Sequence, residues 1–177
     1  EFEVELLAGK NEFRVVGLSR DFIESRPAKV TVSYSGAQRR STLHLVTIGI
    51  NKYRNPALNL NYGVPDANGL SDFFAAQPLK LFKEVKVHAL FDRDATRDAI
   101  EDVMEDLEDT RPEDVVVVYL AGHGDTIGED WYFMPTEISY PERPDHVREN
   151  GIRSSALDEW VANAPAQKIV MLMDSCK

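Results

Sequence analysis

The chain has 177 residues, of which 43% are hydrophobic and 28% are charged, and its formal net charge at pH 7 is −10. This length and apolar content suit one α/β domain, alone or with a fragment of a second domain, and argue against a disordered chain. The acidic balance argues against a nucleic-acid partner. No apolar run approaches the roughly 18 residues that a membrane span needs, so we expect no membrane partner either.

Residues 1–35 have the alternating pattern of antiparallel β-strands. Apolar and polar residues alternate in three short segments, at residues 2–6, 13–15 and 30–34. Three strands of this size cannot bury a full core, so we expect the tail of a β-sandwich or a connector. A polar linker over residues 36–42 follows. The charge balance also changes here, from seven basic and six acidic residues in residues 1–40 to 13 basic and 24 acidic residues after them.

After the linker, the pattern alternates between strands and helices. We predict strands at residues 43–50, 85–91, 115–120 and 168–173. We predict helices from residue 65 to before Pro78, over residues 96–110, and from residue 155 to before Pro165. This order predicts an α/β fold with a mostly parallel sheet and helices on both faces, in which residues 121–154 are mainly a loop. The acids of residues 101–114 lie opposite an apolar stripe, so we interpret them as a solvated helix face and expect no metal site.

Two short motifs follow the third and fourth predicted strands. His123 lies in the segment AGHGD, and Cys176 lies in the segment DSC. The ligand crevice of a parallel sheet lies beyond the carboxyl ends of its strands, so neighbouring strands would bring His123 and Cys176 together. A thiol and an imidazole in one cleft are the minimal parts of a cysteine nucleophile with a general acid and base. The backbone N–H groups of Gly124 and Cys176 are the candidate oxyanion donors.

Each member of this pair has an ordinary alternative. A lone cysteine at a strand end is usually a small buried hydrophobe, and a histidine between glycines is often only a loop residue. The pair is more specific, because both residues directly follow buried strands and His123 precedes Cys176 by 53 positions. Cys176 is also the only cysteine, which excludes an intrachain disulfide and a multi-cysteine zinc cluster. A lone thiol fits a reducing compartment, so we expect a cytoplasmic protein.

The chain resembles the caspase-like cysteine peptidases of the metacaspase and bacterial caspase-homologue branch. The matching stretches cover most of residues 43–176 and read LHLVTIGINKYRNPALNLNYGVPDANGLSDFF, VVVVYLAGHGD, WYFMP and GIRSSALDEWVANAPAQKIVMLMDSC. The resemblance implies a caspase-hemoglobinase fold, cleavage of peptide bonds, and a catalytic dyad of Cys176 and His123. It implies that residues 43–177 are the large-subunit part of the domain, which a small-subunit segment completes. It also implies an attached sensor or regulatory domain, since residues 1–35 resemble the connector that precedes such peptidase domains in bacteria.

The resemblance further implies a substrate preference. Asp174 stands two positions before Cys176, where animal caspases have Gln and metacaspases have an acid in the S1 pocket. Asp66 aligns with a second S1 acid of metacaspases. Two carboxylates in a partly desolvated pocket favour a guanidinium or ammonium group, so we expect cleavage after Arg or Lys. The alternative for Asp66 is a first-turn acid that complements the helix dipole.

Two features depart from the family pattern. Calcium-dependent metacaspases carry an acid-rich segment after the catalytic histidine, but residues 128–131 (GEDW) hold only two acids. We therefore expect no cofactor, and calcium dependence is doubtful. The chain also stops at Lys177, before the small-subunit segment. A cut after Lys177 would match a basic preference and suggests self-processing, and Arg40 is a second candidate processing site.

The sequence thus predicts a cysteine endopeptidase that acts on protein or peptide substrates. The resemblance implies a regulated effector in bacterial stress or antiphage response. Three alternatives stay open: a catalytically inactive caspase-like interaction module, a caspase-like peptidase with Asp specificity, and a flavodoxin-like binder of nucleotides or small molecules. The intact pair argues against the first, and the negative charge of Asp174 argues against the second. No GxGxxG or GxxxxGK[ST] pattern follows a strand, which argues against the third.

Overall fold

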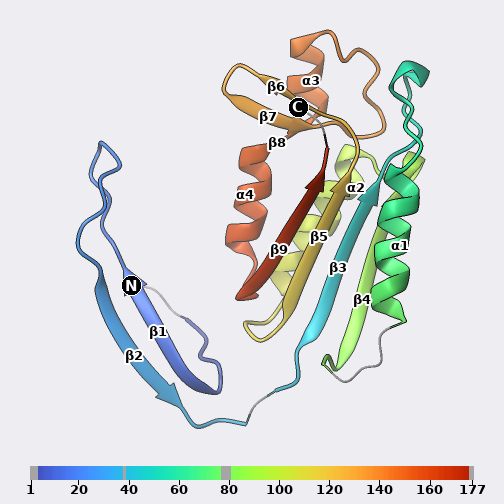
Figure 1. The fold of residues 1–177 in the computed structure, drawn as a ribbon. Coiled ribbons are helices and arrows are strands. Elements are labelled where there is room, and N and C mark those ends of the chain that lie inside the picture. Colours follow the sequence, from blue (N-terminus) through green and yellow to red (C-terminus); the bar gives the residue numbers. More distant parts are fainter. Residues whose placement is uncertain (1–3, 38, 77–80, 176–177) are drawn as a thin grey trace. The chain divides into compact units, whose positions relative to one another are not determined.

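The computed structural model describes three stretches of the chain, residues 4–37, 39–76 and 81–175. The chain divides into two compact units, Glu1–Arg40 and Ser41–Lys177, and Figure 1 labels the elements of each. The first unit contains an antiparallel hairpin of β1 (Gly9–Val15) and β2 (Ala28–Tyr34). These two strands correspond to the second and third of the predicted N-terminal strands.

The first predicted N-terminal strand is wrong within the described residues. Residues 4–6 form no strand, and residues 2 and 3 lie outside the described part of the chain. The side chain of Asn11 explains the difference. It accepts a hydrogen bond from the Leu7 N–H at 2.9 Å and donates one to the Leu7 carbonyl oxygen at 2.8 Å. These bonds occupy the backbone groups that a strand ladder would need at Leu7, so the chain turns there.

The second unit is built on a four-stranded parallel sheet with the strand order β4-β3-β5-β9. The strands are β3 (Thr42–Gly49), β4 (Glu84–Phe91), β5 (Val115–Ala121) and β9 (Lys168–Asp174). Because β3 and β5 lie in the middle of the sheet and are mostly buried, their sequences are nearly continuous apolar runs. The mostly parallel sheet predicted from the sequence is confirmed.

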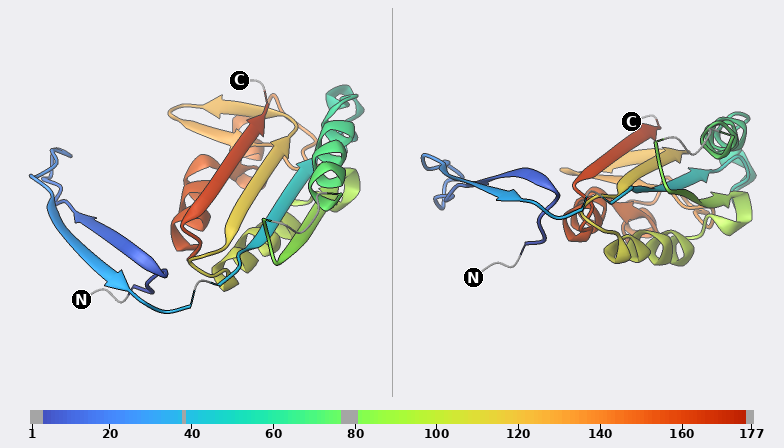
Figure 2. Two further views of the ribbon diagram at one scale, coloured as in Figure 1. Left: turned by 60° about the horizontal axis from the view of Figure 1, so that its bottom comes forward. Right: turned by 90° about the horizontal axis from the view of Figure 1, so that it is seen from below.

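Helices cover both faces of this sheet, as the sequence predicts (Figure 2). On one face, α1 (Gly63–Ala75) packs against β3 and β5 through Leu70 and Phe74. On the other face lie α2 (Arg97–Glu105) and α4 (Ser154–Asn163). The side chains that α2 and α4 bury in the core are Ile100, Met104, Leu157 and Trp160. The sheet is therefore the middle layer of three, with a separate apolar cluster on each of its faces.

Three short 3-10 helices connect these elements in the described part of the chain. They are η1 (Pro56–Leu58), η2 (Asp92–Asp94) and η3 (Asp106–Asp109). The helix predicted over residues 96–110 is α-helical only as far as Glu105, and η3 continues it in the tighter 3-10 form. Within the described residues, no helix is long and apolar enough to cross a bilayer.

The segment between β5 and α4 is largely structured, so its prediction as a loop is wrong. It contains a second, antiparallel sheet of β6 (Gly124–Ile127), β7 (Asp130–Phe133) and β8 (Ile152–Arg153). The helix α3 (Pro144–Asn150) lies between β7 and β8 in the chain. These strands are two to four residues long, too short for a clear alternation of apolar and polar residues. Gly128, with φ at +71°, makes the tight turn between β6 and β7.

Two glycines let the first turn of α1 approach the carboxyl ends of β3 and β5. A Cβ atom at Gly49 would lie 2.5 Å from the Gly63 carbonyl oxygen and 2.8 Å from the Ala67 Cβ. A Cβ atom at Gly63 would lie 2.9 Å from the Ile50 carbonyl oxygen and 3.1 Å from that of Ala121. Most of these neighbours are backbone atoms, which cannot move aside as the end of a flexible side chain can. Both positions therefore need glycine, and the first turn of α1 is held against the two strand ends.

A buried histidine-aspartate pair lies at the start of β3, at the amino end of the sheet. The His44 Nε2 is 3.5 Å from the Asp114 Oδ2, and the two side chains are 10% and 7% exposed. Asp114 also accepts hydrogen bonds from the N–H groups of Thr42 and Arg111, at 2.7 and 3.0 Å. Burial lowers the pKa of His44 below its ordinary value of 6.5, and the charge of Asp114 only partly opposes this shift.

We predict that Gly49→Ala lowers the free energy of unfolding by about 2 kcal/mol, as overpacked cores do. The added methyl group would collide with α1, which cannot retreat without opening the core. Gly69→Ala is the matched control, because it lies in α1 and a Cβ atom there meets nothing within 4 Å. The control should be stabilised by about 0.5–1 kcal/mol through helix propensity. Urea unfolding measures both, and a Gly49→Ala variant as stable as the wild type would contradict the prediction.

We also predict that the free energy of unfolding falls as the pH drops below about 6.5. The unfolded chain binds a proton at His44 near pH 6.5, whereas the folded chain, with its lowered pKa, binds it only at lower pH. The stabilising contribution is complete above this range and is lost as the pH falls through it. His44→Gln removes the titrating group, so its stability should fall less between about pH 7 and about pH 5.5. Urea unfolding of the wild type and of His44→Gln across this pH range tests the prediction. An equal loss of unfolding free energy in the two proteins would contradict it.

Candidate active site

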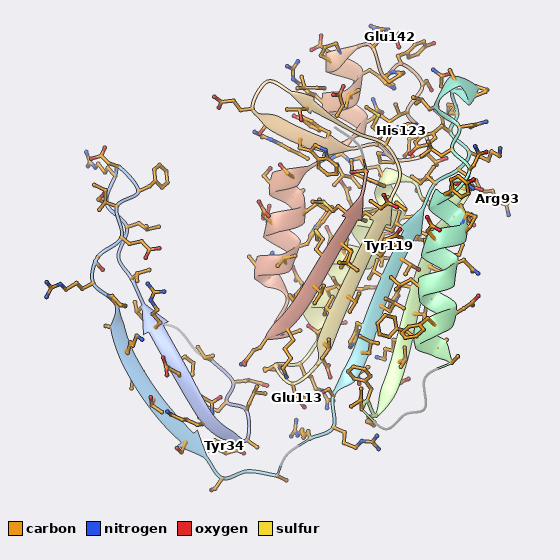
Figure 3. The ribbon with its side chains drawn as sticks, viewed as in Figure 1. Tyr34, Arg93, Glu113, Tyr119, His123 and Glu142 are labelled. Carbon is orange, nitrogen blue, oxygen red and sulfur yellow. The ribbon has the colours of Figure 1, made fainter. Side chains whose placement is uncertain are left out.

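The carboxyl ends of β5 and β9 lie side by side, and predicted site residues follow both strands. Ala121 at the end of β5 pairs with Asp174 at the end of β9. The Gly122 N–H donates to the Asp174 carbonyl oxygen at 3.2 Å. His123 follows directly and is half-buried at this edge of the sheet (Figure 3). The predicted nucleophile, Cys176, comes two positions after Asp174 in the sequence and lies outside the described residues.

A backbone carbonyl orients the imidazole of His123. The His123 Nε2 lies 2.9 Å from the carbonyl oxygen of Leu58, the last residue of η1. A carbonyl oxygen only accepts hydrogen bonds, so Nε2 carries the ring proton and Nδ1 is the basic nitrogen. The side chain of Asn55 holds η1 in place, because it accepts from the Ala57 N–H at 3.0 Å and donates to the Ser139 carbonyl oxygen at 2.9 Å. On the other side of Leu58, the Asn59 side chain accepts a hydrogen bond from the Tyr53 N–H at 3.0 Å, so bonds on both sides hold the Leu58 carbonyl in position.

Tyr53 holds the backbone of His123. The Tyr53 hydroxyl oxygen accepts a hydrogen bond from the His123 N–H at 2.8 Å, and the centres of the two rings are 5.3 Å apart. Burial raises the pKa of Tyr53 to about 12, so its phenol stays protonated at neutral pH. The His123 carbonyl oxygen accepts from the Met134 N–H at 2.9 Å. A Cβ atom at Gly122 would lie 2.8 Å from the Tyr53 hydroxyl, so glycine before His123 leaves room for this contact.

Gly124 turns its N–H away from β7. In an antiparallel ladder, hydrogen-bonded pairs alternate with pairs that exchange no hydrogen bond. The Met134 N–H donates to His123, so the next pair, Gly124 with Phe133, falls at a position without ladder bonds. A side chain at Gly124 would collide with the Trp131 ring. The N–H of Gly124 is therefore not used in the β6–β7 ladder, and the Trp131 ring leaves room only for glycine at this position.

The two predicted pocket acids lie near one tyrosine on the α1 face of the sheet. Tyr119 precedes Ala121 by two positions on β5, so its side chain points to the same face as that of Asp174. The Tyr119 hydroxyl donates to the Asp174 Oδ2 at 3.2 Å. Asp66 lies in the first turn of α1. Burial, Asp174 and, to a smaller extent, Asp66 raise the pKa of Tyr119 to about 12, so both carboxylates act on this hydroxyl. The part of either acid in substrate binding stays a prediction.

Sequence reasoning missed three of these contacts, which involve Tyr53, Leu58 and Tyr119. Leu58 acts through its main chain, so the identity of its side chain carries no signal. Tyr53 lies in the stretch NKYRNPAL, which is part of the sequence that resembles the family. A tyrosine directly after a strand, taken alone, suggests only an apolar contact. Tyr119 lies in the run VVVVYLA, where its hydroxyl is the one polar side-chain group and was the available signal.

The remaining predicted features are the two processing sites and the absence of a metal or cofactor. Arg40 is exposed at the end of the first unit, and Lys177 is not among the described residues. Within the described stretches, no three His, Cys, Asp or Glu side chains gather into a group that could hold a metal ion. The absence of a cofactor and of calcium dependence stays a prediction.

Comparisons with known proteins agree with this fold. A family model described as the caspase domain of the peptidase C14 group matches residues 43–177. The crystal structure of protein GSU0716 from Geobacter sulfurreducens is similar, with a TM-score of 0.57 and 17% sequence identity over 77% of this chain and 50% of that chain. At this identity the likeness shows the fold alone, and the chain spans about half the length of that protein. A search of curated proteins finds no match.

We predict that Tyr53→Phe speeds the hydrogen exchange of the His123 amide, because that half-buried N–H loses its acceptor. The free energy of unfolding should also fall, by about 0.5–1.5 kcal/mol, the net contribution of a typical hydrogen bond. Tyr62→Phe is the matched control, since Tyr62 is 74% exposed. Amide exchange by NMR and urea unfolding test the two effects. Unchanged exchange at His123 would show that the Tyr53 hydroxyl does not hold this residue.

Proposed function

Because the chain belongs to the caspase-domain family of cysteine peptidases, whose substrates are proteins, we propose that it is an endopeptidase with Cys176 as nucleophile and His123 as general acid and base. One observation carries the proposal beyond the family match. His123 stands at the paired ends of β5 and β9, with its ring proton committed to the Leu58 carbonyl. Its other ring nitrogen, Nδ1, can therefore accept the proton of a thiol. In the sequence, Cys176 comes just after the second of these strands.

The proposed reaction has two steps that share one imidazole. The His123 Nδ1 accepts the proton of the Cys176 thiol, and the resulting thiolate forms a bond to the carbonyl carbon of the substrate peptide. The imidazolium gives that proton to the leaving amine as the C–N bond breaks, which leaves a thioester on Cys176. Water, deprotonated by the same nitrogen, then attacks the thioester carbonyl, and the sulfur leaves as the restored thiol. The hydrogen bond to Leu58 supports the imidazolium in both steps.

Backbone amides would stabilise the negative oxygen that forms in each step. The Gly124 N–H lies outside the β6–β7 ladder and directly follows His123, which suits it to this purpose. The Cys176 N–H is the second proposed donor, because a nucleophile's own amide necessarily lies close to the carbonyl it attacks. Glycine at position 124 is also the residue that the ring of Trp131 permits.

The proposed substrate preference is a basic residue before the cut. Asp174 and Asp66 both act on Tyr119, so a cation near that hydroxyl would meet two negative charges. The proposed pocket contains no cationic partner for Asp174 among the described residues, where its carboxylate is bonded by the neutral Tyr119 hydroxyl. An Arg or Lys side chain would supply the missing positive charge.

The proposal includes a small-subunit segment that pairs with β9. This strand is the last of the described sheet, and its outer edge has no neighbouring strand among the described residues. Its side chains on the α1 face are also open, since Val170 and Leu172 are 47% and 44% exposed. An added strand would cover this edge and extend the cleft. The proposed role as a regulated effector in bacterial stress or antiphage response rests on the family resemblance alone, and the proposed cytoplasmic location rests on the lone cysteine.

We predict that the full-length protein cleaves fluorogenic peptides after Arg or Lys, with or without calcium, and that Cys176→Ala abolishes the cleavage. Asp174→Asn should lower kcat/KM for these peptides about 10- to 100-fold, because it removes a charged partner of the substrate cation. Asp158→Asn is the matched control, since Asp158 is an exposed acid on α4. The assay compares peptides that end in Arg, Lys or Asp.

Each contrary outcome of this assay identifies a different error. Cleavage only after Asp would keep the dyad and overturn the acidic pocket. Cleavage that survives in Cys176→Ala would overturn the nucleophile. No cleavage, together with no labelling of Cys176 by a peptide electrophile, would favour a catalytically inactive interaction module. Activity that appears only with added calcium would overturn the expected absence of a cofactor.

A further inference from the structure

Tyr119 makes a contact that the proposed reaction does not use. Its hydroxyl donates to the Asp174 Oδ2 at 3.2 Å, across the β5–β9 pair. The two residues are diagonal neighbours, because Ala121 is the direct partner of Asp174, and diagonal neighbours are within reach of a long aromatic side chain. The side chain of Tyr119 is half-buried against the sheet, which restricts the positions that its hydroxyl can take.

The first turn of α1 brings a second acid to the same place. Gly63 packs closely against the Ala121 carbonyl, which sets the start of α1 beside the end of β5. Asp66 lies one turn further along the helix, and its charge acts on Tyr119. The Tyr119 hydroxyl is therefore a neutral donor placed within the field of two carboxylates.

We propose that Tyr119 is a positioning residue for specificity, which holds the Asp174 carboxylate through Oδ2 so that Oδ1 can receive the cation of the substrate. The inference rests on the proposed cleavage after Arg or Lys. It deepens that proposal, because it assigns the choice between these two cations to a residue outside the dyad and outside the two predicted pocket acids.

The hydrogen bond should matter more for Arg than for Lys. A guanidinium is a planar fork of donors, and it pairs well only with a carboxylate whose plane is fixed. An ammonium is a compact charge with rotatable donors, and it tolerates a carboxylate that turns. Since the pKa of Tyr119 is raised to about 12, its hydroxyl remains a donor at every pH used in a peptidase assay. Loss of the hydroxyl would free Asp174 to rotate and would weaken Arg recognition selectively.

The test compares Tyr119→Phe with the wild type in the full-length protein, on two peptides that differ only in Arg or Lys before the cut. Phenylalanine keeps the ring and removes only the donor. We expect kcat/KM to fall about tenfold for the Arg peptide, mainly through KM, and less than about threefold for the Lys peptide. In an Asp174→Asn background, Tyr119→Phe should cause no further change in the Arg to Lys ratio. Tyr140→Phe is the control for removal of a hydroxyl, because Tyr140 lies before α3 and is 51% exposed.

The outcomes separate this inference from the function on which it rests. Wild-type cleavage after Arg with an unchanged Arg to Lys ratio in Tyr119→Phe overturns the role of Tyr119 and leaves the peptidase intact. An equal fall for both peptides, or a fall in kcat alone, indicates a merely structural tyrosine and also overturns it. A wild-type protein that cleaves after neither Arg nor Lys overturns the proposed pocket, and the positioning role falls with it.

Discussion

The register between β5 and β9 is the constraint on which the rest of the site depends. Side chains alternate between the two faces of a strand, so a slip of one residue would turn Asp174 from the α1 face to the opposite face. The observed register pairs Ala121 with Asp174 and sends both Tyr119 and Asp174 to one side. It is determined by burial, because the alternate residues of β5 fill the core under α2 and α4. The apolar core thus determines the face of the sheet on which Tyr119 and Asp174 lie.

The main chain then supplies most of the positioning at the site itself. The His123 ring is bonded to a backbone carbonyl at Leu58, and both of its own peptide groups are bonded as well. A carbonyl in a capped turn has little conformational freedom left to lose, whereas an acidic side chain in the same position would have to be ordered. Gly49 and Gly63 act in the same way, since they bring backbone to backbone at the start of α1.

The apolar core positions the strands, whereas main-chain groups position the site. This difference explains which parts of the molecule could be predicted from sequence. The four strands of the parallel sheet and the helices α1, α2 and α4 are seven or more residues long, and their apolar patterns are clear, so their order followed from the sequence. His123 was found because its type and place after a buried strand are both specific. The contact with Leu58 could not be predicted, because it involves a carbonyl that every residue has. The strands β6 to β8 are too short for a period, and Asn11 overrides the alternation before β1 through its own bonds to Leu7.

The acids at the two ends of the sheet show why the role of an acidic residue cannot be predicted from its type alone. Asp114, at the amino end, is 7% exposed, and its oxygens are satisfied by two backbone N–H groups and the His44 ring. Asp174, at the carboxyl end, is exposed and is held by one hydroxyl within the described residues. A buried acid whose two oxygens are both bonded within the fold is closed to a substrate and acts on stability. An exposed acid that is oriented but incompletely bonded keeps that capacity, and this difference comes from the partners around each carboxylate and not from the residue type.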